Sequence, residues 1–148
     1  MAQGTYQDGE YRETRSMEDQ AELKLMLNSI ADLYLTANVL ILLDNTYPGR
    51  FWTLTEAWCA MMKVTAQGVR MAITDAERRY SISCIHNANP EFDLPKLVQM
   101  LSTKGPEEMH AILASPDVCV TNAKDKETML PIVGKTDEHV REMMSGMH

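Results

Sequence analysis

Apolar residues recur along the chain at two spacings, one helical and one typical of buried strands. Between residues 23 and 34 they fall on one helical face, which predicts an amphipathic helix of about five turns that begins after Ser16. At Val39–Leu43 five apolar residues stand in a row, and a run this short is typical of a strand buried on both faces of a parallel sheet. Turn-forming residues at 44–49 end this strand, and a second helix is expected over residues 53–63.

The second half of the chain continues the alternation of strands and helices with shorter elements. Residues 80–85 and 117–121 each carry a short apolar run, and they predict two further strands. Residues 64–79 show no clear period, so the region around Gly68 is expected to be a loop, and Thr74 could open a short helix. Three more helices are expected, over residues 94–101, 106–113 and 136–144.

Helices that alternate with three apolar strands indicate an α/β domain with a parallel sheet. Three strands are few for such a sheet, and a strand as apolar as Val39–Leu43 does not belong at an unprotected edge. We therefore expect the sheet to be incomplete and a protein partner or a second copy of the chain to cover that edge. Residues 1–16 are polar and predict a flexible leader, which leaves residues 17–148 as a single domain.

Charge and hydropathy exclude several classes of function. The net charge of -7 at pH 7 argues against nucleic-acid binding, because no basic stripe is present to neutralise phosphates. The longest apolar run, Val39–Leu43, is far shorter than the ~20 residues that a membrane span needs. The N-terminal residues lack the apolar core of a signal peptide, so a cytoplasmic or organelle-matrix protein is expected.

Cysteine and histidine positions give no sign of a metal centre. Cys59, Cys84 and Cys119 form no CxxC pair and each lies in an apolar stretch, which predicts free, buried thiols. No two of the histidines have the spacing of metal ligands, so no metal is predicted. The sequence also contains no dinucleotide-binding, P-loop or hydrolase-elbow motif, and no cofactor is expected.

One segment resembles a known family. Residues 37–58, ANVLILLDNTYPGRFWTLTEAW, are similar to the middle of a TIR domain, in which an apolar third strand leads through a loop to a tryptophan, and a helix then carries a glutamate four residues later. Here these residues are Trp52 and Glu56. A similar string occurs in TIR-like regions of large, mostly uncharacterised proteins of unicellular eukaryotes.

This resemblance implies a three-layer, flavodoxin-like fold with a parallel sheet. The three expected strands would then be the third, fourth and fifth of the family, and the first two strands would be lacking. Strand three would have lost the neighbour on one side, which agrees with the exposed-edge problem of Val39–Leu43.

The resemblance also assigns chemistry to Glu56. In TIR enzymes that cleave NAD, the matching glutamate contacts the nicotinamide ribose and assists the loss of nicotinamide, so NAD is the candidate substrate. A carboxylate suits this step because positive charge develops on the ribose as the glycosidic bond breaks. The residues themselves offer a second interpretation, since Thr53 and Glu56 have the spacing of a capping box, in which the glutamate binds the backbone at the start of its helix.

Four further residues are candidates for substrate binding. Asp44 and His86 directly follow strands, at the end of the sheet where open α/β folds bind ligands. Arg50 could meet a phosphate, and Trp52 could stack on a ring. Structural interpretations compete with these: a turn-forming aspartate, a turn histidine and a solvated or salt-bridged arginine. Trp58 is expected to pack between its helix and the sheet.

Two functions remain open from the sequence. The first is a TIR-like interaction module or accessory subunit that is not catalytic on its own, which the expected loss of the family's front strands favours. The second is a nicotinamide-releasing NAD glycohydrolase that uses Glu56 and depends on self-association or on a partner.

Overall fold

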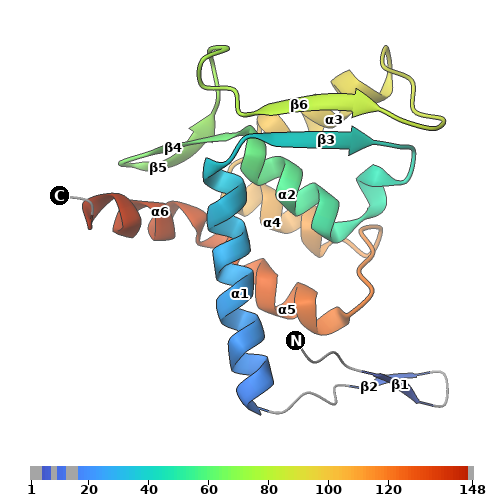
Figure 1. Cartoon of the computed structure of the whole chain (residues 1–148), viewed down its shortest axis with the longest axis vertical. Coiled ribbons are helices and arrows are strands. Elements are labelled where there is room, and N and C mark those ends of the chain that lie inside the picture. The colour runs from blue at the N-terminus through green and yellow to red at the C-terminus, as the bar shows by residue number, and fades with distance from the viewer. Residues whose placement is uncertain (1–4, 8–9, 13–16, 147–148) are drawn as a thin grey trace.

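A computed structural model describes the backbone of residues 5–7, 10–12 and 17–146, with side chains at 17, 18 and 29–146. Figure 1 shows a pair of strands beside a group of helices, so the expected α/β class is confirmed. The helices are α1 (Met17–Thr36), η1 (Tyr47–Gly49), α2 (Phe51–Met61), α3 (Asp93–Ser102), α4 (Pro106–Ala114), α5 (Ala123–Gly134) and α6 (Thr136–Ser145). The strands are β1 (Thr5–Gln7), β2 (Glu10–Arg12), β3 (Val39–Leu43), β4 (Met62–Thr65), β5 (Gly68–Met71) and β6 (Tyr80–Cys84).

β3 and β6 form the only parallel sheet in the described residues, with Ile41 beside Ile82. Ile41 and Leu43 are 2% and 1% exposed, whereas Leu40 and Leu42 are 63% and 48% exposed. Because successive side chains of a strand point to opposite faces, one face packs inward and no described element covers the other. The expected burial of this strand on both faces is therefore wrong, because its unbroken apolar run has no polar residue to mark the outer face.

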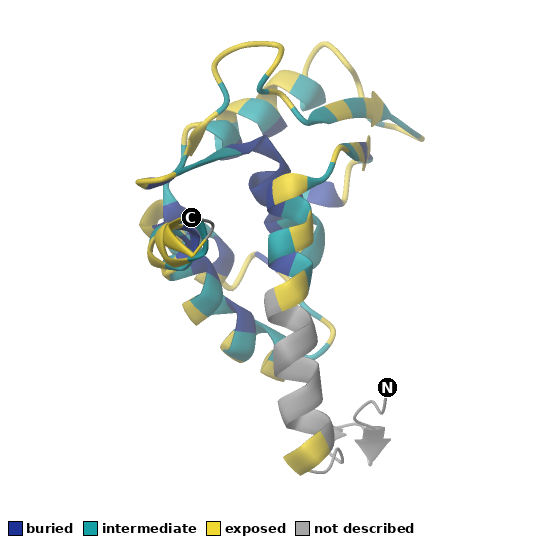
Figure 2. Ribbon diagram, turned by 60° about the vertical axis from the view of Figure 1, so that its left-hand side comes forward, coloured by how far each residue is buried: buried dark blue, intermediate teal, exposed yellow. Residues whose placement is uncertain are grey.

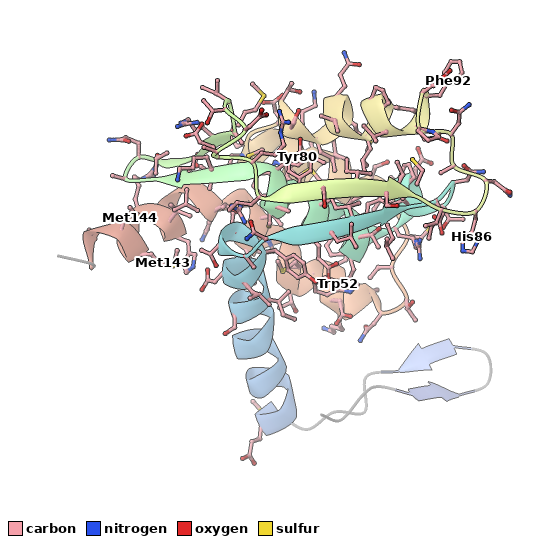
Figure 3. The ribbon with its side chains drawn as sticks, turned by 45° about the horizontal axis from the view of Figure 1, so that its top comes forward. Trp52, Tyr80, His86, Phe92, Met143 and Met144 are labelled. Atoms are coloured by element: carbon pink, nitrogen blue, oxygen red, sulfur yellow. The ribbon has the colours of Figure 1, made fainter. Side chains whose placement is uncertain are left out.

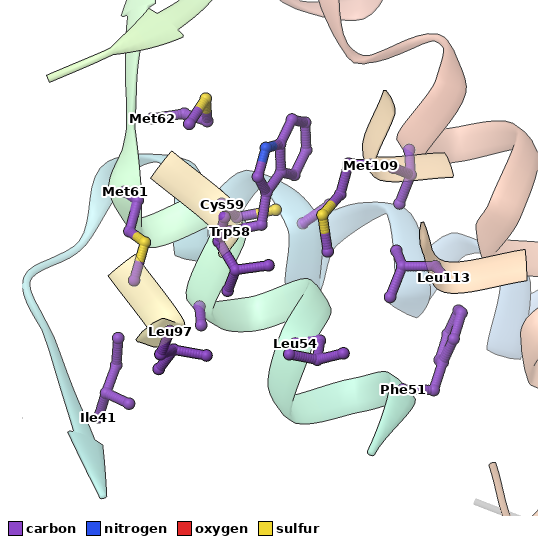
Figure 4. Packing of buried hydrophobic residues seen from close by; sticks show 14 of the residues in the cluster. Ile41, Phe51, Leu54, Trp58, Cys59, Met61, Met62, Leu97, Met109 and Leu113 are labelled. Carbon is purple, nitrogen blue, oxygen red and sulfur yellow. The ribbon is translucent and has the colours of Figure 1, made fainter. Parts of the chain in front are cut away.

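α2 forms the centre of the core. Most of its residues are buried, and Phe51 and Trp58 are 0% exposed. A helix that is apolar on nearly all sides must be enclosed by other elements. Figure 4 shows Ile41 and Leu97 on one side of α2 and Met109 on the other, and Figure 2 shows the buried residues gathered among the helices. The strand pair thus lies over a mainly helical core.

Arg79, directly before β6, joins the ends of two helices. Its guanidinium donates hydrogen bonds to the carbonyl oxygens of Tyr34 and Ala37, at the end of α1, at 3.1 and 2.6 Å. It also donates to the carbonyl oxygens of Cys59 and Met62, at the end of α2, at 3.1 and 2.7 Å. The last carbonyls of a helix have no partner inside it, so a single side chain satisfies two helix ends.

The residues around Gly68, expected to be a loop, form the antiparallel hairpin β4–β5. α6 holds this hairpin, because the Asp137 carboxylate accepts a hydrogen bond from Val69 N at 2.7 Å and Arg141 donates to Gln67 O at 3.2 Å. Gly68 has a φ of 131°, and a Cβ at this position would overlap the Asp137 carboxylate. The hairpin was not predicted because the helix that holds it lies 68 residues away along the chain.

Residues 117–121, expected to be a third strand, form no strand. A single parallel bridge joins them to the start of α2, where Phe51 N donates to Cys119 O at 2.9 Å. The Lys126 ammonium group of α5 binds Val118 O at 2.8 Å, which occupies a carbonyl that a strand would offer to its neighbour. The expectation is therefore wrong, and so is the expected burial of the Cys119 thiol, since Cys119 is exposed.

Elsewhere the agreement between expectation and structure depends on the element. The helices α1, α3, α4 and α6 and the strands β3 and β6 are confirmed, with small shifts at their ends. α5 was not expected, because Pro131 lies inside it and interrupts a helical pattern. The residues from Thr74 to Glu77 form a turn and not the expected helix.

Most of the expected leader lies outside the described residues, and so does Ser16, after which the first helix was expected to begin. Within the described part of the leader, β1 and β2 pair in an antiparallel manner. Among the described helices, none combines the length and the apolar character that crossing a membrane would require.

Candidate functional site

The turn after β3 holds Asp44 and Arg50 in one network. Asp44 Oδ1 accepts hydrogen bonds from Thr46 N at 2.9 Å and from Thr46 Oγ1 at 2.8 Å. Arg50 Nη2 lies 3.1 Å from the same oxygen. The hydrogen bond from the Thr46 hydroxyl is the largest of the effects that lower the Asp44 pKa. The turn-forming interpretation of Asp44 and the salt-bridged interpretation of Arg50 are thus confirmed, and their binding of a substrate stays a prediction.

Glu56 does not close a capping box. α2 begins at Phe51, so Thr53 lies within its first turn and bonds through its own hydroxyl to Arg50 O at 3.1 Å. The Glu56 carboxylate instead lies near the Tyr34 hydroxyl of α1, which opposes the rise in the Glu56 pKa that burial causes. The helix starts earlier than expected because the backbone bridge between Arg50 and Cys119 holds Arg50 in an extended conformation. The capping interpretation of Glu56 is therefore wrong.

Burial dominates the electrostatics of Glu56. It raises the Glu56 pKa, and the nearby Tyr34 hydroxyl opposes this shift. Burial likewise raises the pKa of Tyr34 and that of the neighbouring Tyr47, and the charge of Glu56 adds to both shifts. Within the described residues, no lysine, arginine or histidine forms an ion pair with Glu56. Its negative charge is therefore stabilised by one neutral hydroxyl and by whatever solvent reaches it.

The two tryptophans of α2 have different surroundings. Trp58 is 0% exposed, so its expected burial is confirmed, and its Nε1 donates a hydrogen bond at 2.9 Å to Lys104 O, between α3 and α4. Its packing against the sheet stays a prediction. Trp52 is half-buried, with its ring edge-on to Phe51 at a centroid distance of 5.6 Å. Trp52 and Glu56 are four residues apart and share one face of α2. Figure 3 draws Trp52 beside β3, on the side away from β6.

His86 lies at the same end of the sheet as Asp44. Ile85 N donates to Leu43 O at 2.9 Å, which brings the turns after β6 and β3 together. His86 itself is exposed, with a φ of 54°, and Figure 3 shows it beyond the ends of both strands. No described contact joins His86 to Asp44 or to Glu56. The turn-histidine interpretation is confirmed, and a role as a base has no described partner to support it.

The cavity at this end of the sheet is small. Its volume is about 80 Å³, and its lining includes Asp44, Asp93 and Lys96. Small-molecule sites usually measure about 300 to 1,000 Å³. The described residues also contain no group of three or more histidine, cysteine or acidic side chains placed to hold a metal ion. Cys59 is buried, and burial raises the pKa of its thiol to about 12, which makes it a poor nucleophile.

Comparisons with protein-family models, with curated proteins and with solved structures found no match to this chain. The TIR-like interpretation of residues 37–58 therefore stays a prediction.

Three residues that shape the site were not predicted from the sequence. Tyr34 was placed only on an apolar helical face, and its hydroxyl could not be paired with Glu56 without the packing of α1 on α2. Tyr47 was placed only in a turn, although it is buried and donates to Thr53 O at 3.0 Å. Arg79 carried no signal, since an arginine beside a strand is usually a solvated surface residue.

Proposed function

We propose that this chain is a TIR-like protein-interaction module, without catalytic activity of its own, that binds an extended segment of a protein partner along the free edge of β3. The observation that carries the proposal is that β6 is the only described neighbour of β3, which leaves one edge of this apolar strand unpaired. Leu40 and Leu42, 63% and 48% exposed, also leave its outer face uncovered. An apolar edge strand without a charge, a proline or a covering element invites pairing with another strand.

The backbone of β3 supports this mode of binding. Val39 N donates to Arg79 O at 2.7 Å, and Leu43 O accepts from Ile85 N at 2.9 Å, so these residues direct their backbone groups toward β6. In a parallel strand the alternate residues then direct theirs to the opposite edge. Leu40 and Leu42 therefore offer N–H and C=O groups to an added strand, which is the contact that strand-addition complexes use.

A partner segment suits this edge better than a second folded copy. Figure 1 shows α1 and α2 on the side of β3 away from β6, so a second copy would have to bring its own two helices to the same place. Two copies would also each carry a net charge of -7 and repel one another. A single extended strand brings no helices of its own and does not carry the negative charge of a second copy.

The test replaces Leu42 with proline. Leu42→Pro removes the N–H at the free edge without removing a hydrogen bond to β6, whereas Leu42→Ala keeps that N–H. The probe is a fluorescent, end-capped seven-residue peptide that alternates valine and threonine, and binding is followed by anisotropy. We expect saturable binding to the wild type, about tenfold weaker binding to Leu42→Pro, and a smaller loss in Leu42→Ala.

Circular dichroism must show that both variants are folded. Equal binding of the peptide to the wild type and to Leu42→Pro would contradict the proposal, and so would no binding to either. A wild-type dimer that Leu42→Pro converts to a monomer would show that the occupant is a second copy.

A second candidate function, NAD glycohydrolase, rests on Glu56. This half-buried carboxylate is not used as a helix cap, and it lies on the same helix face as Trp52. The small cavity at the end of β3 argues against it for the chain alone, because NAD needs far more room than about 80 Å³.

We therefore expect the purified chain to release no nicotinamide from NAD, measured by chromatography at high protein concentration. Glu56→Ala is the matched variant. Release by the wild type that disappears in Glu56→Ala would replace the non-catalytic proposal with NAD glycohydrolase activity.

A further inference from the structure

Glu56 is an incompletely compensated carboxylate on the partly exposed face of α2. The buried residues of this helix include Phe51, Leu54 and Trp58, while Trp52 and Glu56 are only half-buried. The described residues give Glu56 one neutral polar neighbour, the Tyr34 hydroxyl, and no ion pair with a cation. Partial burial of a carboxylate with a single neutral partner is unfavourable, because the charge loses solvation without gaining an opposite charge. A cation bound beside it would offset this loss.

This face lies on the side of β3 where an added strand would run. Figure 3 draws Trp52 beside β3 and away from β6, and Figure 1 places α1, which supplies Tyr34, on the same side. A strand paired with β3 would direct alternate side chains to the two faces of the sheet. One set would lie beside Leu40 and Leu42, and the other set would point toward α2.

We propose that the segment bound along β3 is an alternating apolar and basic strand, whose lysine or arginine pairs with Glu56 between Trp52 and Tyr34. This inference rests on the proposed function, and it names the chemistry of the partner. The apolar set of side chains matches the exposed leucines of β3, and the basic side chain supplies the charge that Glu56 lacks.

The aromatic neighbours favour a cation over a neutral polar group. Trp52 lies one turn before Glu56 on the same face of α2, and Tyr34 lies near Glu56 from α1. Aromatic faces attract ammonium and guanidinium groups. The long apolar stem of a lysine or arginine would lie along these rings while its head reaches the carboxylate. The net charge of -7 on the chain would also draw a basic segment toward it.

Three end-capped peptides test the inference against the wild-type protein. They share the order valine, threonine, valine, X, valine, threonine, valine, where X is lysine, norleucine or glutamate. Norleucine keeps the length of the lysine side chain without its charge. We expect the lysine peptide to bind about fivefold more tightly than the norleucine peptide, and the glutamate peptide to bind most weakly.

Glu56→Gln should lower the affinity for the lysine peptide to that of the norleucine peptide and leave the norleucine peptide unchanged. Glu107→Gln removes a carboxylate from an exposed position of α4, so it is the matched control and should keep the lysine preference. Added salt should reduce the preference in the wild type.

The outcomes separate this inference from the proposed function. If all peptides bind equally and Leu42→Pro weakens them all, strand addition holds and the pairing of a basic residue with Glu56 is wrong. A lysine preference that survives in Glu56→Gln would also overturn the inference. If no peptide binds the wild type, the proposed function and the inference both fail.

Discussion

Arg79→Ala should lower the free energy of unfolding by about 3 kcal/mol or more, a large fraction of the stability of a domain of this size. The guanidinium of Arg79 binds four carbonyl oxygens at distances of 2.6 to 3.1 Å, at the ends of α1 and α2. Alanine would leave these carbonyls without their donors in a half-buried position, and hydrogen bonds to charged groups contribute about 1.5 to 3 kcal/mol each when lost singly. Burial lowers the Arg79 pKa, but an arginine stays charged at neutral pH.

Urea unfolding followed by circular dichroism measures this change, and the adjacent Arg78 provides the control. Among the described residues, the Arg78 side chain pairs only with Asp75, at 3.2 Å, and the Asp75 side chain is 96% exposed. Arg78→Ala should therefore change the stability by less than about 0.5 kcal/mol. Arg79→Lys should fall between the wild type and Arg79→Ala, because an ammonium group cannot reach two helix ends at once. Equal stabilities of Arg78→Ala and Arg79→Ala would refute the role given to Arg79.

Arg79 also bears on the proposed binding edge. It holds the carbonyl of Tyr34, whose hydroxyl lies near Glu56, and its own carbonyl accepts the hydrogen bond from Val39 N at the start of β3. The same residue therefore fixes the edge strand and the helix end beside it. A rigid edge loses less conformational freedom when a strand is added, which favours binding.

The elements that could be predicted are those whose signal is local. Val39–Leu43 is a strand because a short apolar run bounded by turn residues is typical of a buried strand and too short for most helices. The turn chemistry of Asp44 was predictable for the same reason, since an aspartate binds the backbone two residues ahead whatever lies around it. α4 follows equally local rules, with Pro106 at its start and acidic residues in its first turn.

The elements that were missed depend on contacts between distant parts of the chain. Residues 117–121 have a strand-like composition, but Lys126 takes one of their carbonyls and the start of α2 provides a single bridge. Glu56 has the spacing of a capping box, yet the bridge to Cys119 makes the helix begin earlier. The Glu56 carboxylate therefore lies near the Tyr34 hydroxyl and not at a helix start. Tertiary contacts decided both cases, and no local propensity could have shown them.

A second large effect is expected in the core. Trp58→Ala should lower the free energy of unfolding by about 3 to 5 kcal/mol, the range found when a buried aromatic residue is truncated. Trp58 is 0% exposed at the centre of α2, so its removal leaves a cavity among residues that have no space to collapse into it. It also leaves Lys104 O without the hydrogen bond that Trp58 Nε1 donates at 2.9 Å.

Trp52→Ala is the matched control, because it removes the same side chain from the same helix at a half-buried position. We expect a loss of only about 1 kcal/mol there, since part of the ring already meets solvent. Urea unfolding followed by circular dichroism compares the two variants, and fluorescence adds a second observable. Emission from Trp58 alone, in Trp52→Ala, should come from an apolar site and shift to longer wavelength on unfolding. If Trp52→Ala proved the more damaging change, α2 would have to present its other face to the core. Glu56 would then lie inside the helical core, where an added strand could not reach it.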